Sequence, residues 1–343
     1  MKWHFRQNWP LILVISGIIL VLIKESADWL SRPRRAAYTE PVPDHWVAPS
    51  LYLDEGPEGE ERKQVIYGEE LITRTSAYFG PNGSIAYITN GMNCQNCHLQ
   101  AGKKAWGNNY GAVSSTYPKF RDRSGSTETI PKRVNDCFER SLNGKALDSS
   151  SREMQAIVAY INWLGKDVKK GEKPAGSGIT QLPYMNRAAD PAKGALVYTA
   201  KCQSCHGANG EGVMNFNQTG FEYPPLWGDH SYNTGAGLYR ISRFAGYVKD
   251  NMPFTQATHK SPALTDDEAW DVAAFVNSRP RPRKDPGGDW PDISKKPLDH
   301  PFGPYTDGYS EEQHKYGPFQ PIADTRKKQE ELKKLSARNL SAN

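Results

Sequence analysis

The chain has 343 residues, which is enough for two domains with separate cores and further segments around them. Lys and Arg total 43 against 38 Asp and Glu, which gives a formal net charge of +5. This surplus is too small for the global basic field of a nucleic-acid-binding protein, so any preference for anions must be local.

An uncharged apolar run from Leu11 to Ile23 follows two basic residues near the start of the chain, as in an export signal. The alanines downstream have Glu or Arg two positions before them and therefore make no small-x-small cleavage site. Trp9 and Trp29 stand roughly 20 residues apart, about the length of a membrane-spanning helix, and are placed to mark its two interfaces. We therefore expect residues 1–31 to form an uncleaved transmembrane signal anchor.

The next stretch leads into the first predicted folded unit. Residues 32–61 are rich in Pro, Gly and acidic side chains and show no periodicity, so we expect a tether. Tyr67, Leu71 and Ile72 then share one helical face. This helix opens a unit that we expect to span residues 62–168.

The run Cys94-Gln95-Asn96-Cys97-His98 has the attachment pattern of a c-type haem, and the pattern recurs at residues 202–206. Two thiols at this spacing reach the two vinyl groups, and the adjacent imidazole holds the iron. A pair of thioredoxin-like sites or one four-Cys zinc site would not explain why His follows the second Cys both times. The sequence therefore predicts two covalently attached c-type haems. Their attachment residues are Cys94, Cys97, Cys202 and Cys205, and their proximal iron ligands are His98 and His206.

A helix is predicted from Thr129 to Asn143, because Thr129 is a candidate N-cap, a proline follows in the first turn and Gly144 ends the pattern. Arg133, Cys137 and Arg140 share one face of it, so two cations would flank the sulfur. Such neighbours depress a thiol pKa and favour both iron ligation and nucleophilicity. An intermolecular disulfide and an inert buried thiol are the alternatives for this odd cysteine.

Another helix ends at Gly165, and a charged linker is expected over residues 169–189. Asp190-Pro191 suits the start of a helix, and Thr265 caps a later helix with a periodic apolar face. A second unit is therefore predicted over residues 190–282. A short helix, an attachment motif, a loop and an amphipathic helix describe a cytochrome c domain in each unit, so the expected fold class is all-α.

Each haem iron needs a second axial ligand, which tunes its potential. In the second unit, Met252 lies in the loop before the last helix, where a thioether is placed to reach the distal face of the haem. Its rivals as ligands are Met214, His230 and His259, and its own alternative role is packing against the haem edge. No methionine stands in the corresponding place of the first unit, which leaves Cys137 as the candidate ligand there.

The last segment, residues 283–343, is rich in Pro and polar side chains and is expected to be an irregular tail. Basic and acidic residues alternate in blocks from Arg326 to Lys334, as in a solvated helix. We expect this tail to wrap the surface or to be partly disordered, and the sequence assigns it no chemistry.

Seven stretches between Gly68 and Pro282 resemble one known family, the dihaem thiosulfate dehydrogenases. The stretches are residues 93–99, 117–125, 133–141, 224–228, 233–237, 251–253 and 268–273. Both attachment motifs, the additional cysteine and the loops between them appear in order. The N-terminal anchor and the tail fall outside the resemblance.

This resemblance implies oxidation of two thiosulfate ions to tetrathionate, with Cys137 as the axial and catalytic thiolate at the first haem. Arg123 and Arg133 match positions where the family binds its anionic substrate. The second haem would pass electrons to an external acceptor such as another cytochrome. Some members carry a Lys before the ligand Met, where Asn251 stands here, so plain His206/Met252 ligation is expected.

Attachment of c-type haem in bacteria takes place outside the cytoplasmic membrane, so the expected location is the periplasmic side of that membrane. The basic residues that follow the apolar run would favour the opposite orientation by the positive-inside rule, and the haem motifs take precedence. Three other functions remain open: a membrane-tethered electron carrier without its own substrate, a tetrathionate reductase, and a cytochrome of the multienzyme sulfur-oxidation system.

Overall fold

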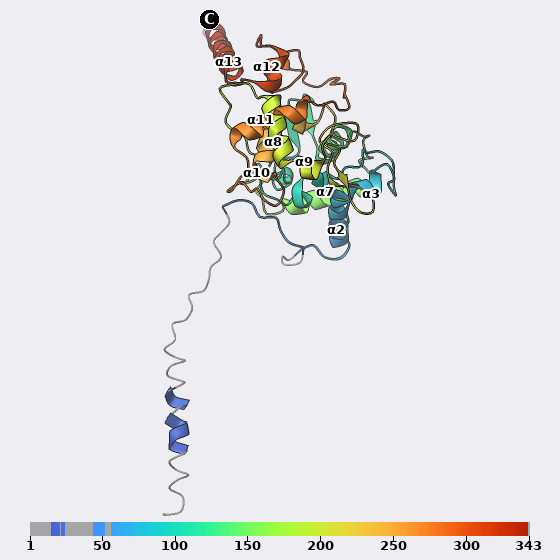
Figure 1. The fold of residues 1–343 in the computed structure, drawn as a ribbon, viewed down its shortest axis with the longest axis vertical. Helices are drawn as coiled ribbons and strands as arrows, with labels where there is room; N and C mark the ends of the chain where they lie inside the picture. Colours follow the sequence, from blue (N-terminus) through green and yellow to red (C-terminus); the bar gives the residue numbers. More distant parts are fainter. Residues whose placement is uncertain (1–14, 21, 25–43, 52–55, 342–343) are drawn as a thin grey trace, which may run out of the picture. The chain divides into compact units, whose positions relative to one another are not determined.

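The computed structural model describes residues 15–20, 22–24, 44–51 and 56–341, in two units that comprise residues 1–43 and 44–343 (Figure 1). In the first unit, residues 15–20 and 22–24 are helical. No helix within the described ranges is both long enough and apolar enough to cross a membrane. Most of the predicted anchor and the beginning of the predicted tether lie outside the described residues.

The second unit opens with a mainly helical first half, which carries the first attachment motif. Its elements are α2 (Gly59–Thr73), α3 (Thr75–Phe79), the 3-10 helix η1 (Cys94–Asn96), α4 (Leu99–Gly102), α5 (Val113–Thr116), β1 (Lys119–Arg121), β2 (Ser126–Glu128), α6 (Ile130–Arg140) and α7 (Arg152–Leu164). Helices α2 and α7 meet at Gly68, where a Cβ would lie 2.0 Å from the carbonyl oxygen of Ala156. Because only glycine permits this approach, Leu71 and Ile157 come together in the core with no exposed surface.

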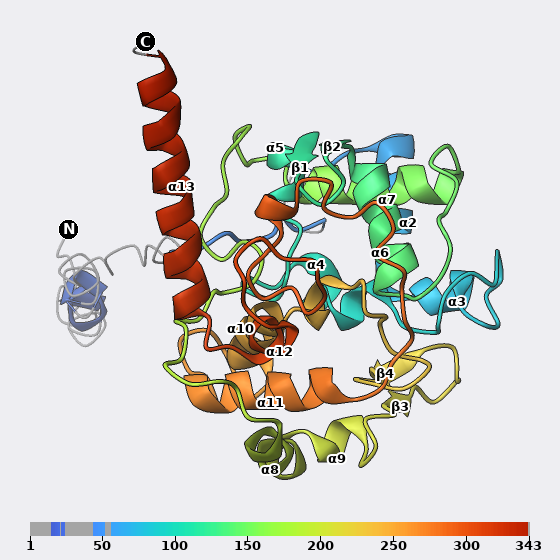
Figure 2. The ribbon, with the colours of Figure 1, turned by 90° about the horizontal axis from the view of Figure 1, so that it is seen from above.

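The second half repeats this construction around the second motif. Its elements are α8 (Pro191–Lys201), α9 (Gln203–His206), β3 (Val213–Met214), β4 (Phe221–Tyr223), the 3-10 helix η2 (Gly237–Tyr239), α10 (Ile241–Asn251) and α11 (Asp266–Ser278). Helices α8 and α11 lie against each other (Figure 2) at Gly194, where a Cβ would lie 1.9 Å from the carbonyl oxygen of Asp271. Trp270 is buried beside this crossing.

The helix starts follow from side-chain caps. Thr129 accepts a hydrogen bond from the main-chain nitrogen of Lys132, and Asp190 accepts two at the start of α8. Thr265 and Glu268 cap α11 reciprocally. These three caps confirm the predicted helix starts.

Two features of the structure differ from the sequence-based expectation: the chain contains short strands, and one helix ends earlier than predicted. Short antiparallel hairpins form from β1 with β2 and from β3 with β4. Strands of two or three residues are too short to show the alternation by which a strand is recognised, so the sequence did not reveal them. Helix α6 also ends at Arg140 rather than at Asn143.

The two halves meet along what we call the asparagine seam, in which asparagine amides bond main-chain carbonyl groups of the opposite half. The Nδ2 atoms of Asn90, Asn96, Asn233 and Asn251 donate to the carbonyl oxygens of Ser231 (3.0 Å), Phe221 (3.3 Å), Glu139 (2.9 Å) and Trp106 (3.1 Å), respectively. The indole of Trp106 also stacks on the ring of His259, with 3.9 Å between ring centroids. Both halves therefore form one body.

The predicted irregular tail is irregular only in its first part. Residues 283–310 contain one short 3-10 helix, η3 (Ile293–Lys295), but α12 (Glu311–Tyr316) and α13 (Gln320–Ser341) follow. Phe319 and Ile322 are buried, and the ring of Phe319 packs on that of Trp270 with centroids 5.6 Å apart. Beyond this anchor, α13 extends away from the other helices (Figure 2), and its charged residues are mostly exposed, as expected of a solvated helix.

We expect Phe319→Ala to lower the free energy of unfolding by about 3 kcal/mol, because it removes a buried ring from the anchor of the tail. Leu332→Ala, at an exposed position of α13, is the matched control and should change stability little. Urea denaturation followed by circular dichroism measures both. Equal stability of the two variants would show that the tail is not held by this contact.

Candidate active site

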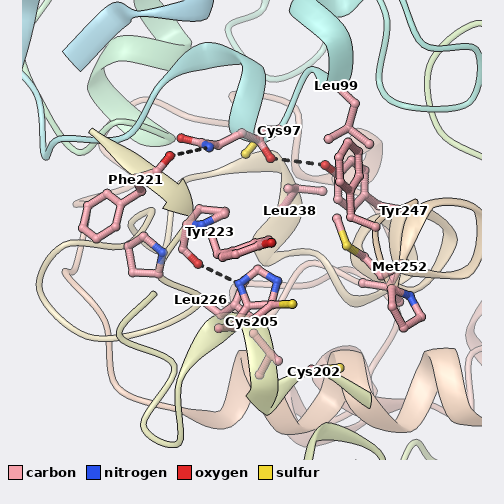
Figure 3. Close-up of a pocket in the computed structure, with 18 of the residues that line it drawn as sticks. Cys97, Leu99, Cys202, Cys205, Phe221, Tyr223, Leu226, Leu238, Tyr247 and Met252 are labelled. Atoms are coloured by element: carbon pink, nitrogen blue, oxygen red, sulfur yellow. Dashed lines mark hydrogen bonds between the residues drawn. The ribbon is translucent and has the colours of Figure 1, made fainter. Parts of the chain in front are cut away.

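A cavity of about 490 Å³ lies in the second half and extends to the first attachment motif (Figure 3). The second half contributes Cys202, Cys205, His206 and Met252 to its wall, Met92 and Cys97 come from the first half, and Leu226, Leu238 and Val272 are among its apolar lining residues. Two thiols, an imidazole and a thioether around one mainly apolar cavity are the donors and surroundings that a c-type haem requires. The residues that line this cavity therefore fit a c-type haem.

His206 is oriented by its main-chain partner. Its Nδ1 lies 2.8 Å from the carbonyl oxygen of Pro224, an atom that can only accept, so Nδ1 carries the proton and Nε2 keeps its lone pair. Burial lowers the pKa of His206, which favours the neutral ring that a metal requires.

Among the four candidate distal ligands of the second half, Met252 lines this cavity, whereas Met214, His230 and His259 are not part of its wall. Met252 follows α10 directly with an extended backbone. Met214 lies in β3 and is 41 % exposed, and His259 is held in the stack with Trp106. Of the four, Met252 alone lines the cavity that also contains His206.

His98, in the first half, has the same kind of partner. Its Nδ1 lies 2.5 Å from the carbonyl oxygen of Asn108, and its ring stacks on Tyr110. Burial, with a smaller contribution from the charge of Arg133, lowers the pKa of His98 to about 4. The imidazole is therefore neutral, with Nε2 available to a metal.

The attachment cysteines of this half lie close to Cys137. Burial, with an additional effect of the neighbouring Cys137, raises the pKa of both Cys94 and Cys97 to about 12. The main-chain nitrogen of Cys94 donates to Thr75 Oγ1 over 3.0 Å, which fixes the start of the motif. The thiol that α6 provides thus faces the first haem site.

Arg133 contacts this thiol directly, with its Nη1 3.3 Å from Cys137 Sγ. The two residues stand one helical turn apart on α6. The sulfur is the main cause that raises the pKa of Arg133, so the guanidinium stays charged. The Cys137 sulfur thus has a fixed, charged hydrogen-bond donor beside it.

Arg140 does not flank the sulfur as its spacing on α6 suggested. Its Nη1 and Nη2 donate to the two carboxylate oxygens of Asp289, at 2.9 and 3.0 Å. Its Nε lies 4.0 Å from Asp136 on the same helix. The guanidinium of Arg140 is therefore bound by carboxylates and not by the Cys137 sulfur.

Arg123 shares the same carboxylate. Its Nε donates to Asp289 over 2.9 Å, and its Nη2 donates to the carbonyl oxygen of Gly235 over 2.8 Å. Burial alone would raise the pKa of Asp289, but Arg140 and Arg123 outweigh it and hold that pKa below its usual range. Asp289 is therefore charged at neutral pH. The structure thus brings Arg133 to Cys137 and Arg123 to Asp289.

Further cations lie near this site. Arg121 donates to the hydroxyl of Tyr117 over 3.3 Å. Burial and then the charges of other arginines, including Arg121 and Arg133, lower the pKa of Arg243 on α10. Arg243 of the second half thus lies within electrostatic reach of Arg121 and Arg133 of the first half.

Sequence reasoning did not identify Asp289, Arg121 or Arg243 as parts of the site. Asp289 stands in a Gly-Gly-Asp-Trp stretch of the tail with no motif around it. Its role depends on a tertiary contact across 149 positions of the chain, which no local pattern encodes.

Two family models match the chain, one to each half. "Cytochrome c" matches residues 191–280, and "SoxA/TsdA, cytochrome c domain" matches residues 86–169. Together with the mostly helical structure, they confirm two cytochrome c domains.

Known proteins resemble the chain across both domains. A thiosulfate dehydrogenase of Allochromatium vinosum is 35 % identical over 271 residues, which cover 77 % of this chain and 95 % of that protein. The chain belongs to the thiosulfate dehydrogenase family. A thiosulfate dehydrogenase of Psychrobacter arcticus is 41 % identical over 207 residues, or 60 % of this chain and 61 % of that protein. Family membership confirms the resemblance seen in the sequence, and with the two cytochrome c domains it shows that the protein carries two c-type haems.

One solved structure agrees with this assignment. The thiosulfate dehydrogenase (TsdBA) from Marichromatium purpuratum superposes with a TM-score of 0.63 at 31 % sequence identity. The match covers 70 % of this chain and 50 % of that chain. The chain therefore spans half of that protein and less than two thirds of the Psychrobacter relative.

We propose Met252 as the distal ligand of the second haem, and expect Met252→Ala to abolish the far-red sulfur-to-iron band and to lower the midpoint potential of that haem. Met214→Ala, which removes an exposed thioether, is the matched control. Absorption spectroscopy and a redox titration of the haem-loaded protein measure both effects. An unchanged spectrum in Met252→Ala would exclude this ligand.

Proposed function

We propose that the protein oxidises two thiosulfate ions to tetrathionate at a site built on Cys137 and passes the electrons to an external acceptor. The contact between Arg133 Nη1 and Cys137 Sγ, 3.3 Å apart beside Cys94 and Cys97, carries this proposal. The names of the family's relatives support thiosulfate as the substrate. By the same reasoning, the protein is expected on the periplasmic side of the membrane, where c-type haems are attached.

The reaction joins two dianions through their outer sulfur atoms, so repulsion between them must be offset. Arginine suits this role because its planar guanidinium donates two parallel hydrogen bonds to an oxyanion. Arg133 lies at the sulfur, and Arg123 is the second residue assigned to the substrate. The cations around them attract a dianion more strongly in a partly buried site than in water.

Cys137 is proposed both as a ligand of the first haem and as the nucleophile. Its sulfur bonds to the outer sulfur of one thiosulfate, and two electrons leave as this disulfide-type bond forms. The outer sulfur of a second thiosulfate then attacks the outer sulfur of the adduct, which forms tetrathionate and releases the Cys137 thiolate. A covalent adduct divides one difficult coupling into two easier steps, and Arg133 stabilises the thiolate before and after.

When bound, the two haems would each accept one electron. The first haem would do so at the substrate site. The second, held by His206 and Met252, would pass electrons to an acceptor such as another cytochrome. The neutral His98 and His206 hold the iron without adding charge to the site.

We expect Cys137→Ser to lower kcat for tetrathionate formation on the order of 10³-fold or more, because it removes the nucleophile. Arg133→Ala should lower kcat/KM about 10²-fold by removing one charged donor. Lys145→Ala removes an exposed cation five residues after the end of the same helix and should leave both constants nearly unchanged. The assay uses purified haem-loaded protein with ferricyanide as the acceptor.

Mass spectrometry after exposure to tetrathionate should also show an adduct on Cys137. Equal activity of Cys137→Ser and the wild type would remove this thiol from the mechanism. A wild type with both haems and no activity would favour the electron carrier or, if it consumes tetrathionate, the reductase.

A further inference from the structure

The tail contributes a charged group to the arginines of the first half, although it lies outside both matched family domains. The carboxylate of Asp289 binds Arg140 through both oxygens and Arg123 through one. The side chain of Asp289 is 11 % exposed, and those of Arg123 and Arg140 are 19 % and 14 % exposed. Charge-assisted hydrogen bonds with so little exposed surface hold their geometry more firmly than ion pairs in water.

The backbone fixes Asp289 in place from both sides. The main-chain nitrogen of Trp290 donates to the carbonyl oxygen of Arg123 over 2.7 Å, and Lys284 N donates to Thr234 Oγ1 over 3.0 Å. Ten residues after Asp289, the buried carboxylate of Asp299 accepts from Ser242 N at the start of α10 over 3.1 Å. The tail is therefore attached to both halves around this carboxylate.

The two arginines are used differently. Arg140 gives both terminal nitrogens to Asp289, and its Nε has no hydrogen-bond partner within the described chain but is buried, so Arg140 presents no exposed N–H to a substrate oxyanion. Arg123 gives Nε to Asp289 and Nη2 to Gly235, while none of the described residues hydrogen-bonds its Nη1. The second carboxylate near Arg140, that of Asp136, is paired with Lys132 over 2.5 Å. Two carboxylates therefore face three cations in this cluster, which leaves one positive charge uncompensated. Both observations point to Arg123 as the member that remains available to an anion.

We propose that Asp289 is a positioning residue of the substrate site. Arg140 holds the carboxylate of Asp289, and this carboxylate fixes the guanidinium of Arg123. The Nη1 atom of Arg123 is thereby presented to the sulfonate group of the substrate. This inference rests on the proposed function and adds the tail to the substrate site. Asp289 itself does not touch the substrate. Its effect reaches the reaction through Arg123.

The test compares Asp289→Asn with Asp285→Asn, which makes the same change of charge at an exposed position of the same segment. We expect Asp289→Asn to raise KM for thiosulfate roughly 10-fold and to leave kcat within about twofold, because an interaction common to the bound substrate and the transition state is lost. Added positive charge alone would lower KM, so a rise reports lost orientation. Asp285→Asn should behave as the wild type.

A double-mutant cycle shows whether the effect passes through Arg123. In an Arg123→Ala background, Asp289→Asn should change KM no further. A full additional effect there would mean that Asp289 acts on the fold alone, and would overturn the proposal. A fall in KM in the single variant would also overturn it, since Asp289 would then be a competing internal anion. So would an unchanged KM with a shifted haem potential, because the arginines would then serve a haem.

Binding of sulfate, a dianion that does not react, separates this inference from the proposed function. Calorimetry on the haem-loaded protein should show roughly 10-fold weaker sulfate binding in Asp289→Asn than in the wild type and in Asp285→Asn. Weaker binding in a protein that forms no tetrathionate would remove the proposed function and keep the positioning role. Equal sulfate binding and equal KM in an active protein would overturn the positioning role alone.

Discussion

Compensation of partly buried arginines is the constraint on which the rest of the site depends. A guanidinium removed from water is destabilising unless anions and acceptors replace its hydration. Asp289 meets this need for Arg123 and Arg140, and Asp299 meets it for Arg240, whose Nε donates to it over 2.8 Å. Both carboxylates come from the tail. The tail is thus part of the electrostatic structure of the two cytochrome domains rather than a covering.

The two domains share one helical scaffold but differ in the residue that each is proposed to offer as the second ligand of its haem iron. Gly68 and Gly194 each let one helix approach the carbonyl group of another. The histidine of each attachment motif is oriented by a main-chain carbonyl group, and burial lowers its pKa. The second domain places a thioether in an apolar cavity, which suits an electron exit. The first domain places a thiol beside a guanidinium, which suits an anionic substrate.

The features that could be predicted from the sequence are those that depend on residues close together in the chain. The attachment motifs, the capped helix starts and the turn of helix that brings Arg133 to Cys137 all depend on residues within a few positions of one another. The capture of Arg140 by Asp289 depends on residues 149 positions apart, and helical spacing alone placed this guanidinium wrongly beside the sulfur. The solvated helix expected over residues 326–334 is present within α13, but its buried start at Phe319 was missed for a similar reason.

Helix α13 is attached by the buried side chains of Phe319 and Ile322 and by Arg326, whose Nε donates to the buried Asp307 over 2.6 Å. Composition described the charged positions from Lys327 to Lys334 correctly as solvated, but could not show that Phe319 would pack on Trp270 or that Arg326 would pair with Asp307. The short hairpins were missed because three residues carry too little alternation to be recognised.

The asparagine seam has a consequence for how the protein responds to its medium. Its donors are amides and its acceptors are carbonyl groups, none of which carries a charge that titrates or attracts counter-ions. Dissolved ions screen the attraction between exposed cations and a dianion, with a Debye length of about 8 Å at physiological ionic strength. A high salt concentration would therefore weaken the electrostatic attraction of the substrate, whereas the hydrogen bonds that hold the two haem domains together would be unaffected.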